Sequence, residues 1–300
     1  MSKPDSQPRI CDYEGSNYRT EFWEGRGREY EDRVERIALR KLLPESGRRM
    51  LEVGAGFGRL TNEYDHFGQV ILLDYSLSQL QYAQEHLGRS PRYIYVAADA
   101  YKLPFQPGIF DCATVVRVLH HMADVTRVMQ QLRHVVSPGG TLILEHANKR
   151  NLKAIVRYAL HKQTWNPDDL APVEFVELNF DFHPEHIKQE LAHAGFDLQV
   201  RIPVSFFRLQ TLKERVPQGL LVGMDSLLQT TGLMYAPSIF TKSIAVGSTP
   251  DNRSVETLFA CPECGGEVVR SGEILTCRTD GRRWAVRDGI YDFKAPIEVD

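Results

Sequence analysis

A glycine-rich loop, residues 52–58 with the sequence EVGAGFG, lies where a buried strand gives way to a helix. Glycine is favoured in such a loop because a ligand packed against the backbone leaves no room for a Cβ atom, and because the turn can require positive φ. A dinucleotide fingerprint needs a third glycine three positions after the second, but Arg59 occupies that position. The G-x-G-x-G spacing therefore disfavours a nicotinamide or flavin cofactor.

Two acidic residues follow the next two predicted strands. Asp74 ends the second strand, 22 residues after Glu52, and Asp99 ends the third. A carboxylate at the end of the second strand can accept hydrogen bonds from both hydroxyls of a ribose, although a helix cap or a turn would also use an aspartate. Because the carboxyl ends of parallel strands share one edge of a sheet, the loop and both carboxylates predict a nucleotide-containing ligand there.

A second group of chemically active residues lies near the C-terminus. Cys261 and Cys264 form a C-x-x-C knuckle, and Cys277 with Asp280 repeats it after twelve intervening residues. Three thiolates and one carboxylate are acceptable zinc ligands. About forty-five residues bury too little apolar surface to be comfortably stable alone, so a metal or docking onto a larger domain is needed. The alternative to zinc is a metal-free ribbon, held by the apolar side chains of Leu258, Phe259, Ile274, Trp284 and Ile290.

The elements that position these residues alternate between strands and helices. An amphipathic helix runs from Tyr30 to Leu42, and helical patterns follow at 76–87 and 124–136. Buried strands are predicted at 49–53, 70–73, 93–97, 112–116 and 141–144. This order is typical of a doubly wound, mostly parallel α/β sheet.

The rhythm changes after residue 148. Helices are predicted at 149–162 and 184–194, an alternating pattern at 176–182, and further strands at 198–202 and 238–246. Residues 205–237 are apolar and helical in character, and a Gly- and Pro-containing linker at 247–252 separates the last fifty residues.

Composition excludes several function classes. The 300 residues include 36 Lys and Arg and 39 Asp and Glu, a formal net charge of −3, so we expect no nucleic-acid partner for the molecule as a whole. No apolar run approaches the length of a membrane span, and the first residues are too polar for a signal peptide. We therefore expect a cytoplasmic protein. Its five cysteines favour thiols or metal ligands over a disulfide framework.

Successive motifs resemble those of class I S-adenosylmethionine-dependent methyltransferases, in the subgroup that contains the quinone-biosynthesis methyltransferases. The resemblance covers about residues 28–148 and rests on residues 52–58, Asp74, 99–105, 110–111, 118–121 and 132–140. It implies a Rossmann-like fold with a seven-stranded sheet. It also implies that residues 28–249 form the methyltransferase domain, preceded by an N-terminal arm over 1–27.

The resemblance assigns roles around the cofactor S-adenosylmethionine. Gly54, Ala55 and Gly56 would pass under the methionine part, with Gly58 in the same loop, and Glu52 would help to hold the amino group. Asp74 would bind the ribose and Tyr75 would lie against the adenine. Asp99 and the Ala100 amide would read the adenine edge. Arg117 would lie beside the transferring methyl group, where it could contact an anionic acceptor or fold outward.

The implied reaction is in-line transfer of the methyl group to a small-molecule acceptor that is lipid-like, quinone-like or a natural product. The alternatives are methylation of a protein or RNA, with the C-terminal ribbon as a recognition module, and a cofactor-binding scaffold without turnover. Orientation and exclusion of water can supply much of the rate. If a base is used, His120 and His121 are the candidates, although both can serve the loop structurally.

Selectivity for the acceptor is expected from segments 149–182 and 205–237 together with the arm, which includes Tyr18, Phe22 and Trp23. The predicted helix at 149–162 carries a basic stripe of Lys149, Arg150, Lys153, Arg157 and His161. This stripe is a solvated face, a contact for a phosphate-bearing substrate, or a peripheral contact with an anionic membrane. The sequence leaves the oligomeric state open.

Residues 256–300 resemble a small bacterial zinc-ribbon-like family related to the activator subunit of eukaryotic methyltransferases. The likeness lies in the paired knuckles and in residues 284–290, with the sequence WAVRDGI. It implies a β-rich ribbon that docks on the methyltransferase domain of the same chain and stabilises it.

Overall fold

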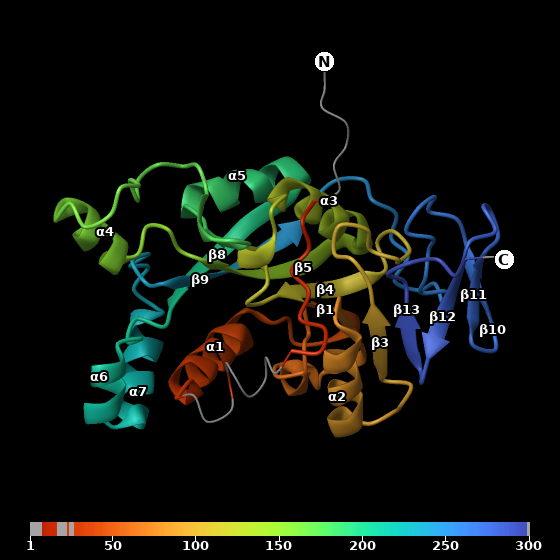
Figure 1. The fold of residues 1–300 in the computed structure, drawn as a ribbon, viewed down its shortest axis with the longest axis horizontal. Coiled ribbons are helices and arrows are strands. Elements are labelled where there is room, and N and C mark those ends of the chain that lie inside the picture. The colour runs from red at the N-terminus through yellow and green to blue at the C-terminus, as the bar shows by residue number, and fades with distance from the viewer. Residues whose placement is uncertain (1–7, 17–22, 24–26, 299–300) are drawn as a thin grey trace, which may run out of the picture.

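The computed structural model describes residues 8–16, 23 and 27–298 of the chain. Within them a twisted sheet is covered by helices on both faces (Figure 1). Its strands are β1 (Gly47–Val53), β2 (Phe67–Asp74), β3 (Tyr93–Ala97), β4 (Phe110–Val115), β5 (Val136–Ala147), β8 (Phe196–Val204), β9 (Ser238–Ala245), β10 (Val268–Ser271), β11 (Ile274–Cys277), β12 (Arg283–Arg287) and β13 (Ile290–Asp292). The helices are α1 (Glu29–Leu42), α2 (Leu77–Leu87), α3 (Val125–Val135), α4 (Leu152–Ala159), α5 (Pro184–Ala194), α6 (Gln210–Arg215) and α7 (Gln218–Leu228), with short 3₁₀ turns η2 (Thr61–Tyr64) and η3 (Leu119–His121).

The predicted seven-stranded sheet is confirmed. Its order is β3-β2-β1-β4-β5-β9-β8. The first five strands are parallel, and β9 is antiparallel to both of its neighbours. In β1 and β2, successive side chains alternate between two cores. Leu51 and Ile71 belong to the core that includes residues of α3, whereas Met50 and Val70 belong to the core that includes residues of α1 and α2.

Local signals set the boundaries of the early helices. The Ser76 hydroxyl accepts a hydrogen bond from the Gln79 amide at 3.3 Å and caps α2, which begins within the predicted range 76–87. Asp124 caps α3 in the same way through the Arg127 amide at 3.0 Å. Gly195 ends α5 in a left-handed conformation.

The prediction was less accurate after residue 148. Helix α4 begins only at Leu152 because Asn151 caps it, and Asn148 accepts the Arg150 amide at 2.9 Å in a turn that precedes it. Residues 173–182 form a hairpin of β6 (Val173–Val176) and β7 (Asn179–Asp181). The predicted helical stretch at 205–237 is divided between α6 and α7, and Pro217 stands at the start of α7.

The last fifty residues add four strands to the same sheet. β10 to β13 pair in antiparallel fashion, and β13 pairs in parallel with β3 through Ile290 and Tyr95, Tyr291 and Val96, and Asp292 and Ala97. Trp284, Val286 and Phe293 are buried in the same core as Leu73 and Val96. The ribbon of residues 256–298 therefore covers what would otherwise be an edge strand (Figure 1).

Candidate active site

Two adjoining pockets lie where the parallel strands end. The first is lined by seven residues predicted to bind the cofactor: Gly54, Gly56, Asp74, Tyr75, Asp99, Ala100 and Arg117. The second lies on the other side of the glycine loop and is lined by Glu52, Ala55, Arg59 and Trp23, among others. Gly58 lines neither pocket and lies beside Leu87 and Thr61. The fold thus brings together residues from the ends of β1, β2, β3 and β4.

Gly54 shows why the loop requires glycine. Its φ is +69°, in the left-handed region that other residues rarely adopt. A Cβ atom at this position would also overlap the Val118 side chain, which follows β4. The backbone of the loop can therefore approach both the next loop and a ligand closely.

Asp74 connects the glycine loop to the start of α2. One carboxylate oxygen accepts the Gly56 amide at 2.8 Å, and the other accepts the Ser76 amide at 2.9 Å. Burial raises the pKa of this carboxyl group, and the backbone amides counteract that effect. The contacts hold the loop in shape while leaving Asp74 in the wall of the pocket.

The ribbon reaches the first pocket at Tyr75. The Lys294 ammonium lies 5.3 Å from the centre of the Tyr75 ring, a cation–π contact. On the opposite wall, Asp99 accepts the Tyr101 amide at 2.8 Å, and burial raises its pKa. No local pattern in the sequence indicated that the segment after β13 (Ile290–Asp292) would lie beside Tyr75, a predicted cofactor residue.

Glu52 lies beneath the second pocket. Its carboxylate accepts a hydrogen bond from the Thr61 hydroxyl at 2.7 Å and lies 3.5 Å from the Tyr64 hydroxyl. Burial raises its pKa to about 7, against the opposing effect of these bonds and of Arg59. Its charge is therefore sensitive to small changes around neutral pH.

Arg117 does not fold outward. Its backbone has φ of +62°, and its amide donates to Glu145 at 2.9 Å. Its guanidinium group is paired with Glu35 of α1, which also pairs with Arg59 at 2.9 Å. The two arginines hold the pKa of the buried Glu35 carboxyl down at about 2, despite burial. Arg117 thus fixes α1 against the mouth of both pockets.

The two histidines occupy different surroundings. His121 lines the first pocket, with one ring nitrogen 3.1 Å from the Tyr13 hydroxyl and the other 2.8 Å from the Leu178 carbonyl oxygen. Burial lowers its pKa. Burial and the neighbouring side chains of His121 and Arg117 lower the pKa of His120 well below its usual value. Both imidazoles are therefore neutral at pH 7.

The N-terminal arm contributes to the site. Ile10, Cys11 and Tyr13 line the first pocket, so this part of the arm belongs to its wall. Trp23 is buried, and the Arg59 guanidinium carbon lies 3.8 Å from the centre of its ring. Tyr18 and Phe22, also predicted to contribute, lie outside the described residues.

Arg208 is a residue that sequence reasoning missed. It follows β8 in a segment fixed by Asp225 and Tyr30, which accept the Phe206 amide at 2.8 Å and the Phe207 amide at 3.1 Å. Its Nε and Nη2 atoms are buried and have no hydrogen-bond partner among the residues that the structure describes. Its charge influences those of His120 and Asp181, so it lies near both. A buried guanidinium without a partner is costly, which marks the position as functional.

Segment 149–182 forms a separate cleft of about 300 Å³. It is lined by Lys153 and Arg157 of the predicted basic stripe, by Trp165 and Phe175, and by Asp181. The stripe is not uniformly solvated, because Lys149 is buried and donates to the carbonyl oxygens of Asp169 and Ala171. The hairpin of this segment meets the first pocket at the contact between Leu178 and His121.

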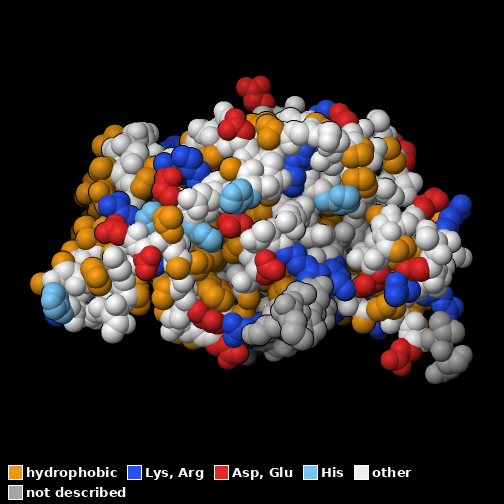
Figure 2. Space-filling model, turned by 90° about the horizontal axis from the view of Figure 1, so that it is seen from above, with side chains coloured by type: hydrophobic (Ala, Val, Ile, Leu, Met, Phe, Trp, Pro, Cys, Tyr) orange, Lys and Arg blue, Asp and Glu red, His pale blue; other side chains and the backbone are white. Residues whose placement is uncertain are grey.

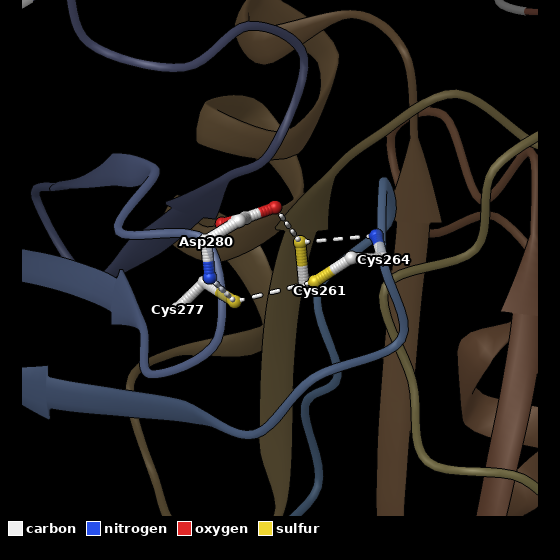
Figure 3. Close-up of side chains that lie close together, drawn as sticks. All are labelled: Cys261, Cys264, Cys277 and Asp280. Atoms are coloured by element: carbon white, nitrogen blue, oxygen red, sulfur yellow. Dashed lines mark hydrogen bonds between the residues drawn. The ribbon is translucent and has the colours of Figure 1, made fainter.

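The four predicted metal ligands converge (Figure 3). One ligand atom from each of Cys261, Cys264, Cys277 and Asp280 lies within 4.8 Å of the others, and the sulfur atoms of Cys264 and Cys277 are 3.5 Å apart. A tetrahedral zinc with bonds of about 2.3 Å needs sulfur atoms roughly 3.8 Å apart. A Cβ atom at Gly266 would overlap Thr279, so glycine permits the two knuckles to meet.

Comparisons with known proteins agree with this geometry. Residues 51–144 match the family described as a methyltransferase domain. Ubiquinone/menaquinone biosynthesis C-methyltransferases UbiE of Pseudomonas fluorescens (strain Pf0-1) and Pseudomonas syringae pv. syringae (strain B728a) are 29% and 28% identical over 179 residues, which is 54% of this chain and 70% of each relative.

Two solved structures share the fold. A complex between the Haloferax volcanii Trm112 methyltransferase activator and a candidate methyltransferase has a TM-score of 0.52, at 16% identity over 75% of this chain and 95% of that chain. An S-adenosylmethionine-dependent methyltransferase from Mesorhizobium loti has a TM-score of 0.50, at 21% identity over 69% of this chain and 95% of that chain. The family match and the relatives support a methyltransferase, and the solved structures share its Rossmann-like α/β fold.

Proposed function

We propose that this methyltransferase acts on a small, largely apolar molecule of lipid-like or quinone-like character. The observation that carries the proposal is the single pocket that gathers Gly54, Asp74, Tyr75, Asp99 and Arg117 at the carboxyl ends of four strands. The relatives that act in ubiquinone and menaquinone biosynthesis support an acceptor of this size. Aromatic residues of the separate cleft in segment 149–182, Trp165 and Phe175, support its apolar character.

The residues have distinct roles in this proposal. Asp74 binds the ribose hydroxyls, Tyr75 and Asp99 hold the adenine, and the glycine loop with Glu52 holds the methionine part. When bound, S-adenosylmethionine supplies an electrophilic methyl group on a sulfonium. Tyr13 and His121 close the pocket against water, because both line it and lie 3.1 Å from each other. Orientation and exclusion of water then supply much of the rate.

Arg208 orients the acceptor. Its unpaired buried Nε and Nη2 atoms provide a partner for a polar or anionic group of the acceptor, which would offset their cost of burial. Segments 149–182 and 205–237 of the methyltransferase domain, residues 28–249, form the cap over the cofactor cleft, with Asp181 from the first and Arg208 from the second.

Cys261, Cys264, Cys277 and Asp280 would bind zinc, because their four donor atoms lie within 4.8 Å of one another, close enough to surround one ion. The ion would serve structure, and the ribbon of residues 256–300 would stabilise the methyltransferase domain. Elemental analysis of protein purified without chelator should find about one zinc per chain; less than about a tenth of an equivalent supports the metal-free ribbon.

Calorimetry of S-adenosylmethionine binding tests the cofactor site. Asp74→Ala should weaken binding by roughly 1–3 kcal/mol, because it removes buried, charge-assisted hydrogen bonds. Unchanged affinity would show that Asp74 does not contribute to cofactor binding.

Transfer of labelled methyl groups to quinone-like and lipid-like acceptors tests the substrate class. Label in added RNA or protein instead would favour the macromolecular alternative, and binding without transfer to any acceptor would favour the scaffold.

A further inference from the structure

The end of the molecule opposite the ribbon exposes an unusual number of apolar side chains. Among the described residues, thirteen of the sixteen large hydrophobic side chains that are exposed lie in segments 149–182 and 205–237. Figure 1 places α4 and α7 at this end, and Figure 2 shows hydrophobic side chains gathered there beside basic ones. Monomeric proteins rarely concentrate exposed apolar surface without a binding role.

Helix α4 presents its apolar face to solvent. Leu152, Val156 and the following Leu160 share one face at intervals of four residues, and they are 60%, 46% and 59% exposed. Ala154 is the one buried residue among those of this helix. In an ordinary surface helix the apolar face would be turned toward the core. Something other than the described part of this chain must therefore cover it.

Helix α7 has the same character. Leu220, Met224 and Leu227 are exposed at helical spacing, whereas Leu221 and Val222 face the core. Residues 216–237 contain a single charged side chain, Asp225, and it is buried against the Tyr30 hydroxyl at 2.6 Å. The outward face of α7 consequently carries no charge.

The segment after α7 joins the two helices. The Tyr235 carbonyl oxygen accepts the Leu152 amide at 2.9 Å, and the Arg150 guanidinium carbon lies 5.5 Å from the centre of the Tyr235 ring. Leu233 and Tyr235 are themselves exposed. The exposed residues of α4, α7 and this segment are called the apolar end below.

Charge identifies the occupant of the apolar end. Residues 149–166 contain five Lys or Arg and no acidic residue. Lys153, Arg157 and Lys162 are exposed next to the apolar face of α4. Among the acidic groups of segment 149–182, Asp168 pairs with Arg150 at 2.6 Å and Glu174 pairs with Arg9 at 2.9 Å. Asp181 lies in the cleft that Lys153 and Arg157 also line. Apolar side chains bordered by Lys and Arg are typical of helices that lie in an anionic lipid interface.

We propose that the apolar end docks this protein on the surface of an anionic lipid bilayer, with α4 and α7 lying in the interface. A second copy of the chain is a poorer occupant, because a symmetric contact through α4 would bring the same cations opposite each other. Helices of the described residues are too short or too polar to cross a bilayer, so the contact is peripheral. The inference goes beyond the proposed function and does not depend on turnover.

Co-sedimentation of the full chain with vesicles tests the proposal. We expect binding to vesicles of phosphatidylcholine mixed with phosphatidylglycerol, weaker binding to phosphatidylcholine alone, and loss of the difference at high salt. Leu152→Asp and Leu227→Asp should each weaken partitioning of the protein onto the vesicles by roughly tenfold or more, because each removes an apolar side chain that the lipid would bury. Lys153→Gln with Arg157→Gln should reduce only the preference for the anionic lipid.

Val200→Asp is the matched control, because Val200 is an exposed apolar residue of β8 outside the apolar end. It should bind vesicles like the unmodified chain, and all variants should retain their thermal unfolding temperature because the changed side chains are exposed. Failure of the unmodified chain to bind anionic vesicles would overturn the proposal. So would a dimer that Leu227→Asp dissociates while vesicle binding is absent, because a second copy would then be the occupant.

Discussion

At the scale of single residues, Glu52 makes stability depend on pH. Its pKa is about 7 in the folded chain and near 4.5 when unfolded, so the folded state binds the proton more tightly. Its contribution is therefore fully present below about pH 4.5 and is lost as the pH rises through about 7. Relative to the unmodified chain, Glu52→Gln should gain roughly 1–3 kcal/mol between pH 5 and pH 8.

Urea unfolding of both proteins without cofactor, at each pH, measures this difference. The comparison matters because His146, whose pKa burial lowers to about 4, works in the opposite direction in both chains. A constant difference between the two proteins across this range would show that Glu52 does not titrate there.

The two arginines beside the pockets should respond oppositely to removal of their charge. Arg117→Met removes one of the two arginines that pair with the buried Glu35 and leaves Arg59, so it should destabilise the fold by roughly 1–3 kcal/mol. Arg208→Met removes a guanidinium whose buried Nε and Nη2 atoms have no hydrogen bond among the described residues, and it should stabilise the cofactor-free chain by about 1 kcal/mol while lowering methyl transfer. Urea unfolding and labelled-methyl transfer measure the two effects. Destabilisation by Arg208→Met would show that the guanidinium is already satisfied.

At the scale of elements, the N-terminal arm is part of the cofactor site. Ile10, Cys11 and Tyr13 line the first pocket, and Tyr13 contacts His121. Deleting residues 1–16 should therefore weaken S-adenosylmethionine binding by roughly tenfold and speed its dissociation, because the pocket opens to water. Stopped-flow dissociation measures the effect. Tyr13→Phe is the control that removes only the hydroxyl contact, and an unchanged dissociation rate in the deletion would place the arm outside the site.

At the scale of the whole molecule, the ribbon and the methyltransferase domain share one sheet and one core. Without residues 250–300, β3 becomes an edge strand, and the Phe105 ring loses its stacked contact with Phe259 at 5.9 Å. The deletion should lower the unfolding temperature by at least about 5 °C and weaken cofactor binding through loss of the Lys294 contact with Tyr75. A chain that ends at Lys294 keeps all four ribbon strands and is the matched control. If calorimetry finds that the chain without residues 250–300 has the same unfolding temperature and the same affinity for the cofactor as the full chain, the ribbon is an independent module.

The sequence by itself determined the features that depend on neighbours a few residues apart. The spacing of Gly54 and Gly56, the cap at Ser76, the alternation of the first strands and the two knuckles were all readable, because periodicity, capping and turn chemistry act locally. The same signals were weaker after residue 148, where Asn148 and Asn151 shortened a predicted helix.

Tertiary structure alone decided the contacts between distant segments. Arg117 meets Glu35 across 82 residues, and Tyr13 meets His121 across 108. β13 joins β3 although β4, β5, β8 and β9 lie between them in sequence. Nor did periodicity show that the apolar face of α4 points away from the core. A hydrophobic pattern shows that burial of one helix face would be favourable. Only the packing of the remaining chain determines whether that face is buried within the same chain.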